Sequence, residues 1–163
     1  MAAPDAPPGI LVLAGTGRDA PLICEALGQA GVRARACHDV VELSAAMPEA
    51  DAAIVTEESL DDPGSAAIRA ALDRQPVWSD LPLIVLGTPY ASTGVGLLDR
   101  LAPTANVTLV ERPTRPLTLV TVARAALRAR DRQYQMRDRM AELVKAREQI
   151  ARQHEKHRAG RRV

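Results

Sequence analysis

Aromatic residues are almost missing from this 163-residue sequence, which has no Phe and only one Trp and two Tyr. Base-stacking and carbohydrate-binding surfaces need several exposed rings, so both are excluded as the main function. The core must instead be built from Leu, Val, Ile and Ala, within a hydrophobic content of 47%. A chain of this size buries one sizeable core and leaves little room for a second globular domain.

Long apolar runs and cysteines are also scarce. No apolar run reaches the roughly 18 residues of a membrane span, and no charged-then-apolar leader is visible, so we expect a cytoplasmic protein. The two cysteines, Cys24 and Cys37, are weak grounds for a disulfide and none for a metal site. We expect both to be buried, inert thiols, and we expect no metal and no cofactor.

Charge is unevenly distributed along the chain. Residues 1–111 contain 6 basic and 15 acidic side chains, whereas residues 112–163 contain 15 basic and 5 acidic ones. Two segments with different roles are indicated. We expect an N-terminal tail that is disordered over 1–8, a globular domain over 9–130 and a connecting helix over 131–163.

Short apolar runs alternate with helical patterns through the first two thirds of the chain. The run Ile10–Leu13 has the length and composition of a strand buried on both faces. We expect four further strands, over Val32–Cys37, Ala52–Val55, Leu83–Leu86 and Val107–Val110. Such alternation through short loops predicts an α/β domain with a parallel sheet.

Helices are expected between these strands. Asp19 is a plausible N-cap for the first and Asp39 for the second, over Val40–Ala46. A turn at Asp62-Pro63-Gly64 should precede a third helix over Ala66–Leu72. Gly87–Asn106 is rich in Thr, Pro, Ser and Gly, so any helix there should be short or mobile.

The C-terminal third predicts one long helix, because neither Pro nor Gly occurs between Pro116 and Gly160. Its apolar positions follow alternating spacings of four and three, which is the pattern of a coiled-coil seam. We therefore expect a homodimer through this helix. The seam residues are Met136, Met140, Leu143, Arg147 and Ile150, with fraying expected beyond them at His154 and His157.

Five β-α units followed by a basic-Pro dipeptide resemble the response-regulator receiver domain over residues 9–130. A narrower likeness is to receiver-like segments at the N-terminus of bacterial sensor histidine kinases. It rests on Trp78-Ser-Asp-Leu-Pro82, Thr56-Glu-Glu58, Asn106-Val-Thr-Leu109, Glu111-Arg-Pro113 and Arg132-Gln-Tyr-Gln135. The resemblance implies a flavodoxin-like, doubly wound sheet in the order 2-1-3-4-5, with a histidine kinase or other signalling domain as partner.

What the resemblance implies for the site is a pocket that has lost its chemistry. Receivers need an acidic pair for Mg²⁺, an acceptor Asp, a Ser or Thr, and a Lys before Pro. Here the matching positions hold Ala14 and Gly15, Thr56 with Glu57 beside it, Gly87 with Thr88 beside it, and Arg112 before Pro113. Without metal ligands or acceptor, phosphorylation has no mechanism. We expect Glu57 to pair with Arg112, and a cis Arg112-Pro113 bond.

The sequence thus favours a pseudo-receiver, not an enzyme: a regulatory, protein-interaction module of bacterial two-component signalling that relays a signal through a dimeric helix. Two alternatives stay open. The segment Gly15-Thr16-Gly17, with Asp39 after the next strand, resembles a dinucleotide-binding fingerprint. An atypical active receiver is the other. Nucleic-acid binding by the basic helix is not favoured, because acidic residues interrupt its positive charge.

Overall fold

The computed structural model describes residues 9–15, 17–88 and 105–161, together with positions 96, 99 and 101. A five-stranded parallel sheet forms the centre, in the order β2-β1-β3-β4-β5. Its strands are β1 (Ile10–Leu13), β2 (Ala34–Ala36), β3 (Ala52–Thr56), β4 (Pro82–Gly87) and β5 (Asn106–Glu111). The flavodoxin-like sheet and strand order expected from the sequence are confirmed.

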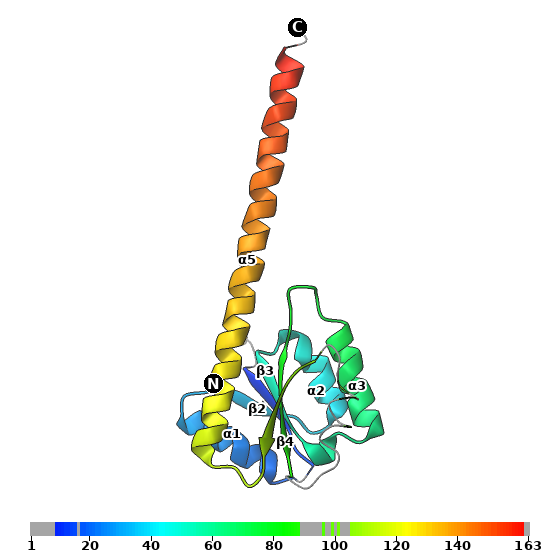
Figure 1. Cartoon of the computed structure of the whole chain (residues 1–163), viewed down its shortest axis with the longest axis vertical. Helices are drawn as coiled ribbons and strands as arrows, with labels where there is room; N and C mark the ends of the chain where they lie inside the picture. Colours follow the sequence, from blue (N-terminus) through cyan, green and yellow to red (C-terminus); the bar gives the residue numbers. More distant parts are fainter. Residues whose placement is uncertain are drawn as a thin grey trace.

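Helices cover both faces of the sheet (Figure 1). One face carries α1 (Asp19–Gln29) and the start of α5 (Pro116–Gly160), and the other carries α2 (Val40–Ala46) and α3 (Asp62–Asp73). Two single turns of 3-10 helix, η1 (Met47–Glu49) and η2 (Glu57–Ser59), flank β3. Because the three central strands lie between these layers, their residues Ile10, Ile54 and Ile84 are fully buried.

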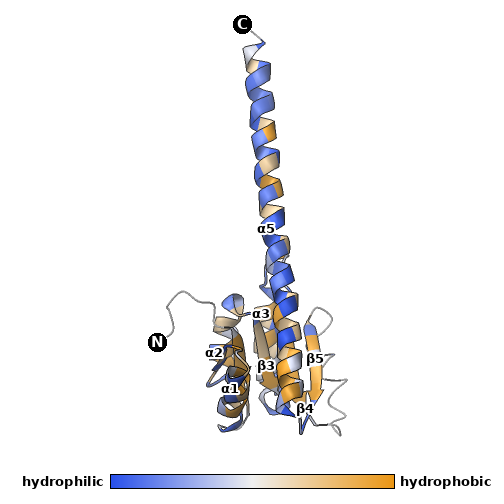
Figure 2. Ribbon diagram, turned by 90° about the vertical axis from the view of Figure 1, so that its left-hand side faces the viewer, coloured by the Kyte–Doolittle hydropathy of each residue, from blue (hydrophilic) through white to orange (hydrophobic). Residues whose placement is uncertain are grey.

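Helix α5 belongs to two environments along its 45 residues. Its first four turns bury Leu119, Val120, Ala123 and Ala126 against the sheet and α1. Beyond the domain the helix stands alone, and Figure 2 shows its residues changing from a mixture of hydrophobic and hydrophilic to mainly hydrophilic. The large apolar residues that remain on this extension are exposed: Met136, Met140, Leu143, Val144 and Ile150. The long C-terminal helix is therefore confirmed.

Several local expectations need correction. Arg18, not Asp19, occupies the N-cap position of α1, and its side chain makes no capping hydrogen bond. The segment Asp62-Pro63-Gly64 is the first turn of α3, because Pro is well suited to an early helical position and Asp61 caps the helix. Cys37 is buried, but Cys24 is half-buried, and both are free thiols.

Some other expectations are confirmed, and some concern residues outside the described ranges. Asp39 caps α2 as expected, accepting a hydrogen bond of 2.8 Å from the Glu42 amide. The Arg112-Pro113 bond is cis. Residues 1–8 and most of Gly87–Asn106, where disorder and a short fourth helix were expected, lie outside the description. In the described ranges, no helix is long and apolar enough to cross a membrane.

Asp61 offers a direct test of how α3 begins. Its carboxylate accepts a hydrogen bond of 2.7 Å from the Gly64 amide, which otherwise has no helical acceptor. Asp61→Ala should lower the free energy of unfolding by about 1 kcal/mol, measured by urea titration. Asp73→Ala, at the other end of the helix, is the control and should be neutral or slightly stabilising, because it removes a negative charge from the helix C-terminus. Equal losses in both variants would contradict the capping role.

Candidate functional site

The carboxyl edge of the sheet brings together the residues that the sequence placed in a receiver-like pocket. At the end of β3, the Thr56 side chain is buried, with 1% of its surface exposed. Its hydroxyl accepts a hydrogen bond of 3.0 Å from the Gly15 amide and lies 3.2 Å from Ser59 Oγ. The Thr56 hydroxyl thus ties β3 to the end of β1.

Glu57 bridges from β3 to the end of β4. Its Oε2 accepts hydrogen bonds from the Thr88 amide at 2.9 Å and from the Thr88 hydroxyl at 3.3 Å. A β-carbon at Gly87 would lie only 3.3 Å from the same oxygen, so a side chain there would crowd the carboxylate. The absence of a Ser or Thr at position 87 therefore gives room for Glu57, and Thr88 supplies the hydroxyl instead.

Glu58 makes an ion pair at this edge, with Nη2 of Arg112, the residue after β5. Our expectation that Glu57 would take Arg112 is wrong, because the turn of η2 carries the neighbouring carboxylate to the guanidinium. Glu58 also packs against Gly15, where a β-carbon would lie 2.7 Å from Glu58 Cβ. The carboxylates of Glu57 and Glu58 are thus both engaged by other residues.

The Glu58–Arg112 pair shapes the electrostatics of the edge. Burial raises the pKa of Glu58, but hydrogen bonds from Arg112 and Thr56 outweigh it and hold the pKa below its usual 4.5. Within the described part of the chain, the buried Nε of Arg112 has no hydrogen-bond partner. Arg112 therefore meets Glu58 through only one side of its guanidinium fork, and the pair is not bidentate.

An open cleft of about 630 Å³ lies beside these residues. Thr56, Glu58, Thr88 and Arg112 form its polar side. Its apolar side comes from α1, from the cis Pro113 and from the start of α5, including Leu22, Ile23 and Leu119. The volume lies in the range of small-molecule sites, and the cleft touches the helix that leaves the domain. A ligand bound in the cleft would therefore contact α5 directly.

The expected pocket residues are thus brought to one edge. Ala14 and Gly15 follow β1 and offer no carboxylate there, and Gly87, Thr88, Arg112 and Pro113 follow β4 and β5. Sequence reasoning missed the roles of Glu58 and Ser59, because only the 3-10 turn after β3 brings Glu58 to Arg112 and Ser59 to Thr56. No group of three or more His, Cys, Asp or Glu suited to a metal occurs in the described ranges.

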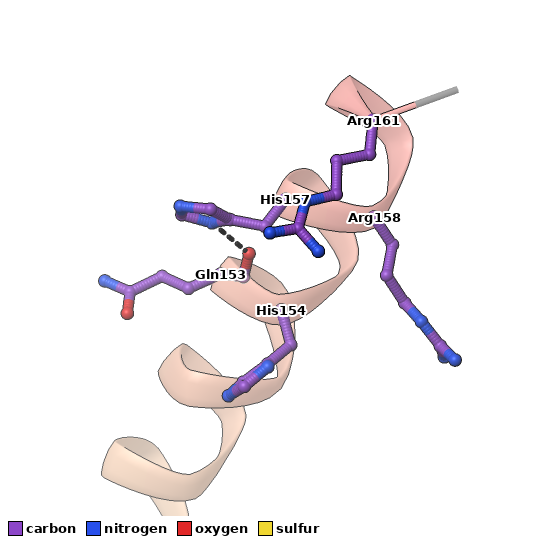
Figure 3. A pocket seen from close by; sticks show the side chains of 5 residues that line it. All are labelled: Gln153, His154, His157, Arg158 and Arg161. Atoms are coloured by element: carbon purple, nitrogen blue, oxygen red, sulfur yellow. Dashed lines mark hydrogen bonds between the residues drawn. The ribbon is translucent and has the colours of Figure 1, made fainter. Parts of the chain in front are cut away.

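The far end of α5 carries the two histidines that could suggest a metal pair. Figure 3 shows them on the surface of a single helix beside Gln153, Arg158 and Arg161. His157 Nδ1 lies 2.9 Å from the Gln153 carbonyl oxygen, which engages that nitrogen with the backbone. The two neighbouring arginines further disfavour a cation there.

Two residues of the pattern that resembles a dinucleotide fingerprint, Gly15 and Asp39, serve other contacts. Gly15 makes room for Glu58, and Asp39, the candidate ribose ligand, caps α2. The acidic Asp19 lies in the first turn of α1, where a pyrophosphate would be repelled. Thr16 lies outside the described residues.

Comparison with known proteins identifies the fold. No family model and no curated protein matches the chain. Among solved structures, NtrX from Brucella abortus aligns with a TM-score of 0.63 and 20% identity, covering 79% of this chain and 28% of NtrX. The isolated receiver domain of NtrX aligns with a TM-score of 0.58 and 22% identity, covering 73% of this chain and 98% of that domain.

A third solved structure is also similar over most of its length. The CheY-like receiver domain protein of Methanospirillum hungatei aligns with a TM-score of 0.61 and 13% identity, covering 76% of this chain and 96% of its own. The α/β part of the chain therefore has the receiver fold. The chain spans nearly whole receiver domains but little more than a quarter of the length of NtrX.

The lowered pKa of Glu58 predicts a pH-dependent contribution to stability. A carboxyl group whose pKa is lower in the folded than in the unfolded state stabilises the fold above its usual pKa of 4.5, and loses this contribution as pH falls through the lowered value. Wild type should therefore exceed Glu58→Gln in free energy of unfolding at neutral pH, with the difference vanishing in acid. Denaturant titrations across pH measure this.

Glu25→Gln, on the exposed face of α1, controls for the loss of one negative charge. A difference between wild type and Glu58→Gln that stays constant from neutral pH into acid would show that the ion pair does not stabilise the fold.

Proposed function

We propose that this chain is a pseudo-receiver: a regulatory module of two-component signalling that transmits binding or conformational signals without accepting a phosphoryl group. The observation that carries the proposal is the hydrogen bond between Thr56 and the Gly15 amide, at the place where an active receiver needs a nucleophilic carboxylate and metal ligands. A threonine hydroxyl cannot form an acyl phosphate, and Ala14 and Gly15 bring no carboxylate to hold Mg²⁺.

The remaining polar contacts of the edge support the same view. The Thr88 amide and hydroxyl are taken by Glu57, and Arg112 is paired with Glu58. In an active receiver the corresponding groups are free to meet the incoming phosphoryl oxygens. Here an incoming phosphoryl group would face the carboxylates of Asp19 and Glu58, and no cation besides Arg112 lines the described part of the cleft. Repulsion would thus replace attraction.

We further propose that the output is a homodimeric coiled coil formed by the extension of α5. The five large apolar residues of the extension are each more than half exposed in the single chain, at 53% to 65%. Met136, Met140, Leu143 and Ile150 form one stripe at heptad spacing, with Val144 beside it. A polar helix that packs against nothing has only its own backbone hydrogen bonds and helix propensity to stabilise it. Pairing with a second copy would add the packing that most helices depend on.

The loss of phosphorylation chemistry can be tested directly. Wild type incubated with Mg²⁺ and acetyl phosphate should gain no phosphoryl mass and no hydroxylamine-labile label, since no acyl phosphate can form. Mg²⁺ with beryllofluoride should leave its amide NMR spectrum unchanged. A receiver domain with the full set of acidic residues is the positive control. Mg²⁺-dependent beryllofluoride binding would instead identify an atypical active receiver.

Two matched substitutions test the dimer. Leu143→Glu places a carboxylate in the stripe of both copies, whereas Gln149→Glu adds the same charge outside it. Sedimentation equilibrium should show a wild-type dimer whose dissociation constant rises at least about tenfold with Leu143→Glu, the equivalent of 1.4 kcal/mol, and little with Gln149→Glu. A dimer unaffected by Leu143→Glu would place the interface on the α/β domain, and a monomeric wild type would refute the dimer.

A further inference from the structure

Helix α5 is attached to the domain a second time, at the amino edge of the sheet. We name as the helix clasp the five residues Trp78, Arg130, Gln133, Tyr134 and Arg137. Four of them lie on one face of α5 at spacings of three and four, and Trp78 comes from the loop before β4. The clasp therefore lies at the opposite end of the sheet from the cleft, where α5 leaves the domain (Figure 1).

Arg130 is the centre of the clasp, and only 2% of its surface is exposed. Its Nη1 donates hydrogen bonds of 2.7 Å to Ser79 Oγ and to Gln133 Oε1, and its Nε donates one of 3.2 Å to the Tyr134 hydroxyl. The guanidinium also lies 5.3 Å from the Trp78 ring centroid and 4.9 Å from that of Tyr134. A buried charge is thus held by neutral oxygens and two ring faces.

Gln133 and Tyr134 connect this centre to the domain backbone. Gln133 accepts a hydrogen bond of 2.9 Å from the Asp80 amide and donates one of 2.7 Å to the Asp80 carbonyl oxygen. The Tyr134 hydroxyl donates one of 2.9 Å to Asp51, directly before β3. Burial, followed by the bond to Asp51, raises the pKa of Tyr134, so it stays a neutral donor. The starts of two central strands are therefore bound to α5.

Arg137 closes the clasp on its outer side. Its guanidinium lies 5.0 Å from the ring centroids of both Trp78 and Tyr134, one helical turn beyond Gln133. The two rings, 5.8 Å apart, are thus contacted by two arginines of the same helix. The contacts of α5 with the domain continue past residue 130, where we expected the domain to end.

The members of the clasp depend on one another. If Gln133 or Tyr134 moves, Arg130 keeps Ser79 Oγ and the Ala50 carbonyl oxygen but loses an acceptor. A buried guanidinium with unpaired donors is destabilising. Partial opening is therefore disfavoured, and the clasp is either closed, with the extension fixed in direction, or open, with the extension free to swing. Hydrophobic packing alone would not fix the direction of the extension, because the buried apolar residues of α5 end at Ala126.

We propose that the helix clasp is the coupling joint of the protein, which makes the α/β domain and the helical extension move as one rigid body while it is closed. The inference deepens the proposed function, because a relay needs a lever with a defined direction. The same helix lines the cleft with Pro116 and Leu119 and reaches Arg130 about 20 Å further along at 1.5 Å per residue. The two edges of the sheet are thereby connected by one rod.

The joint is tested by measuring the direction of the extension. Spin labels are placed on α3 and on the extension by Arg69→Cys and Glu142→Cys, in a background with Cys24→Ser and Cys37→Ala. Pulsed dipolar spectroscopy then gives the distance distribution within one chain, with labelled protein diluted in excess unlabelled protein. For the wild type, with a closed clasp, we expect a single narrow distance distribution. For Arg130→Ala we expect a broad distribution instead.

Arg128→Ala is the matched control, because Arg128 is an exposed arginine two residues away on the same helix. It should keep the narrow distribution. If Arg130→Ala does not fold, Gln133→Ala and Tyr134→Phe each remove a subset of the hydrogen bonds and should each broaden the distribution. A distribution as narrow as wild type in a folded Arg130→Ala, or in both milder variants, would overturn the proposal. Because both labels are in one chain, the distance can be measured whether or not the chain dimerises.

Discussion

The burial of both faces of the central sheet is the constraint on which the rest of this structure depends. Strands β1, β3 and β4 carry apolar residues on each side, so each face needs a helical layer. Helix α5 supplies part of one layer through Leu119, Val120 and Ala123. It cannot detach from the sheet without exposing that face to water. The helix that leaves the domain is therefore anchored by the same hydrophobic effect that holds the sheet together.

At the carboxyl edge of the sheet, small residues and the polar side chains next to them fit one another. Gly87 leaves space for the Glu57 carboxylate, and Gly15 leaves space for Glu58. The Thr56 hydroxyl accepts a hydrogen bond from the Gly15 amide. The edge is thus a connected set of contacts, although Arg112 keeps one unpaired nitrogen beside the cleft within the described residues. Such a set is what a pocket requires if it is to stay folded without metal or phosphate, because isolated buried donors and charges are costly.

The sequence predicted the elements far better than the contacts between them. Apolar runs such as Ile10–Leu13 defined the strands, and the absence of Pro and Gly after Pro116 defined the long helix, since both signals are local. The partner of Arg112 was predicted wrongly, because a single 3-10 turn decides whether Glu57 or Glu58 faces it. The clasp was not predicted at all. Trp78 and the Arg132-Gln-Tyr-Gln135 segment carried the family resemblance, but the hydrogen bonds that join them cross more than 50 residues.

The clasp and the proposed coiled coil also share a residue, which links the two. With Met136 and Leu143 at d positions and Met140 at an a position, Arg132 is a g residue and Arg137 an e residue. In a parallel homodimer these two would face each other across the seam, where like charges destabilise pairing. In the closed clasp, however, the Arg137 guanidinium lies against the Trp78 and Tyr134 rings and beside Asp138 of its own chain. Closing the clasp thus draws a repulsive charge away from the start of the seam. In the proposed dimer, a closed joint and a paired helix would therefore favour each other, and by linkage opening the one would weaken the other.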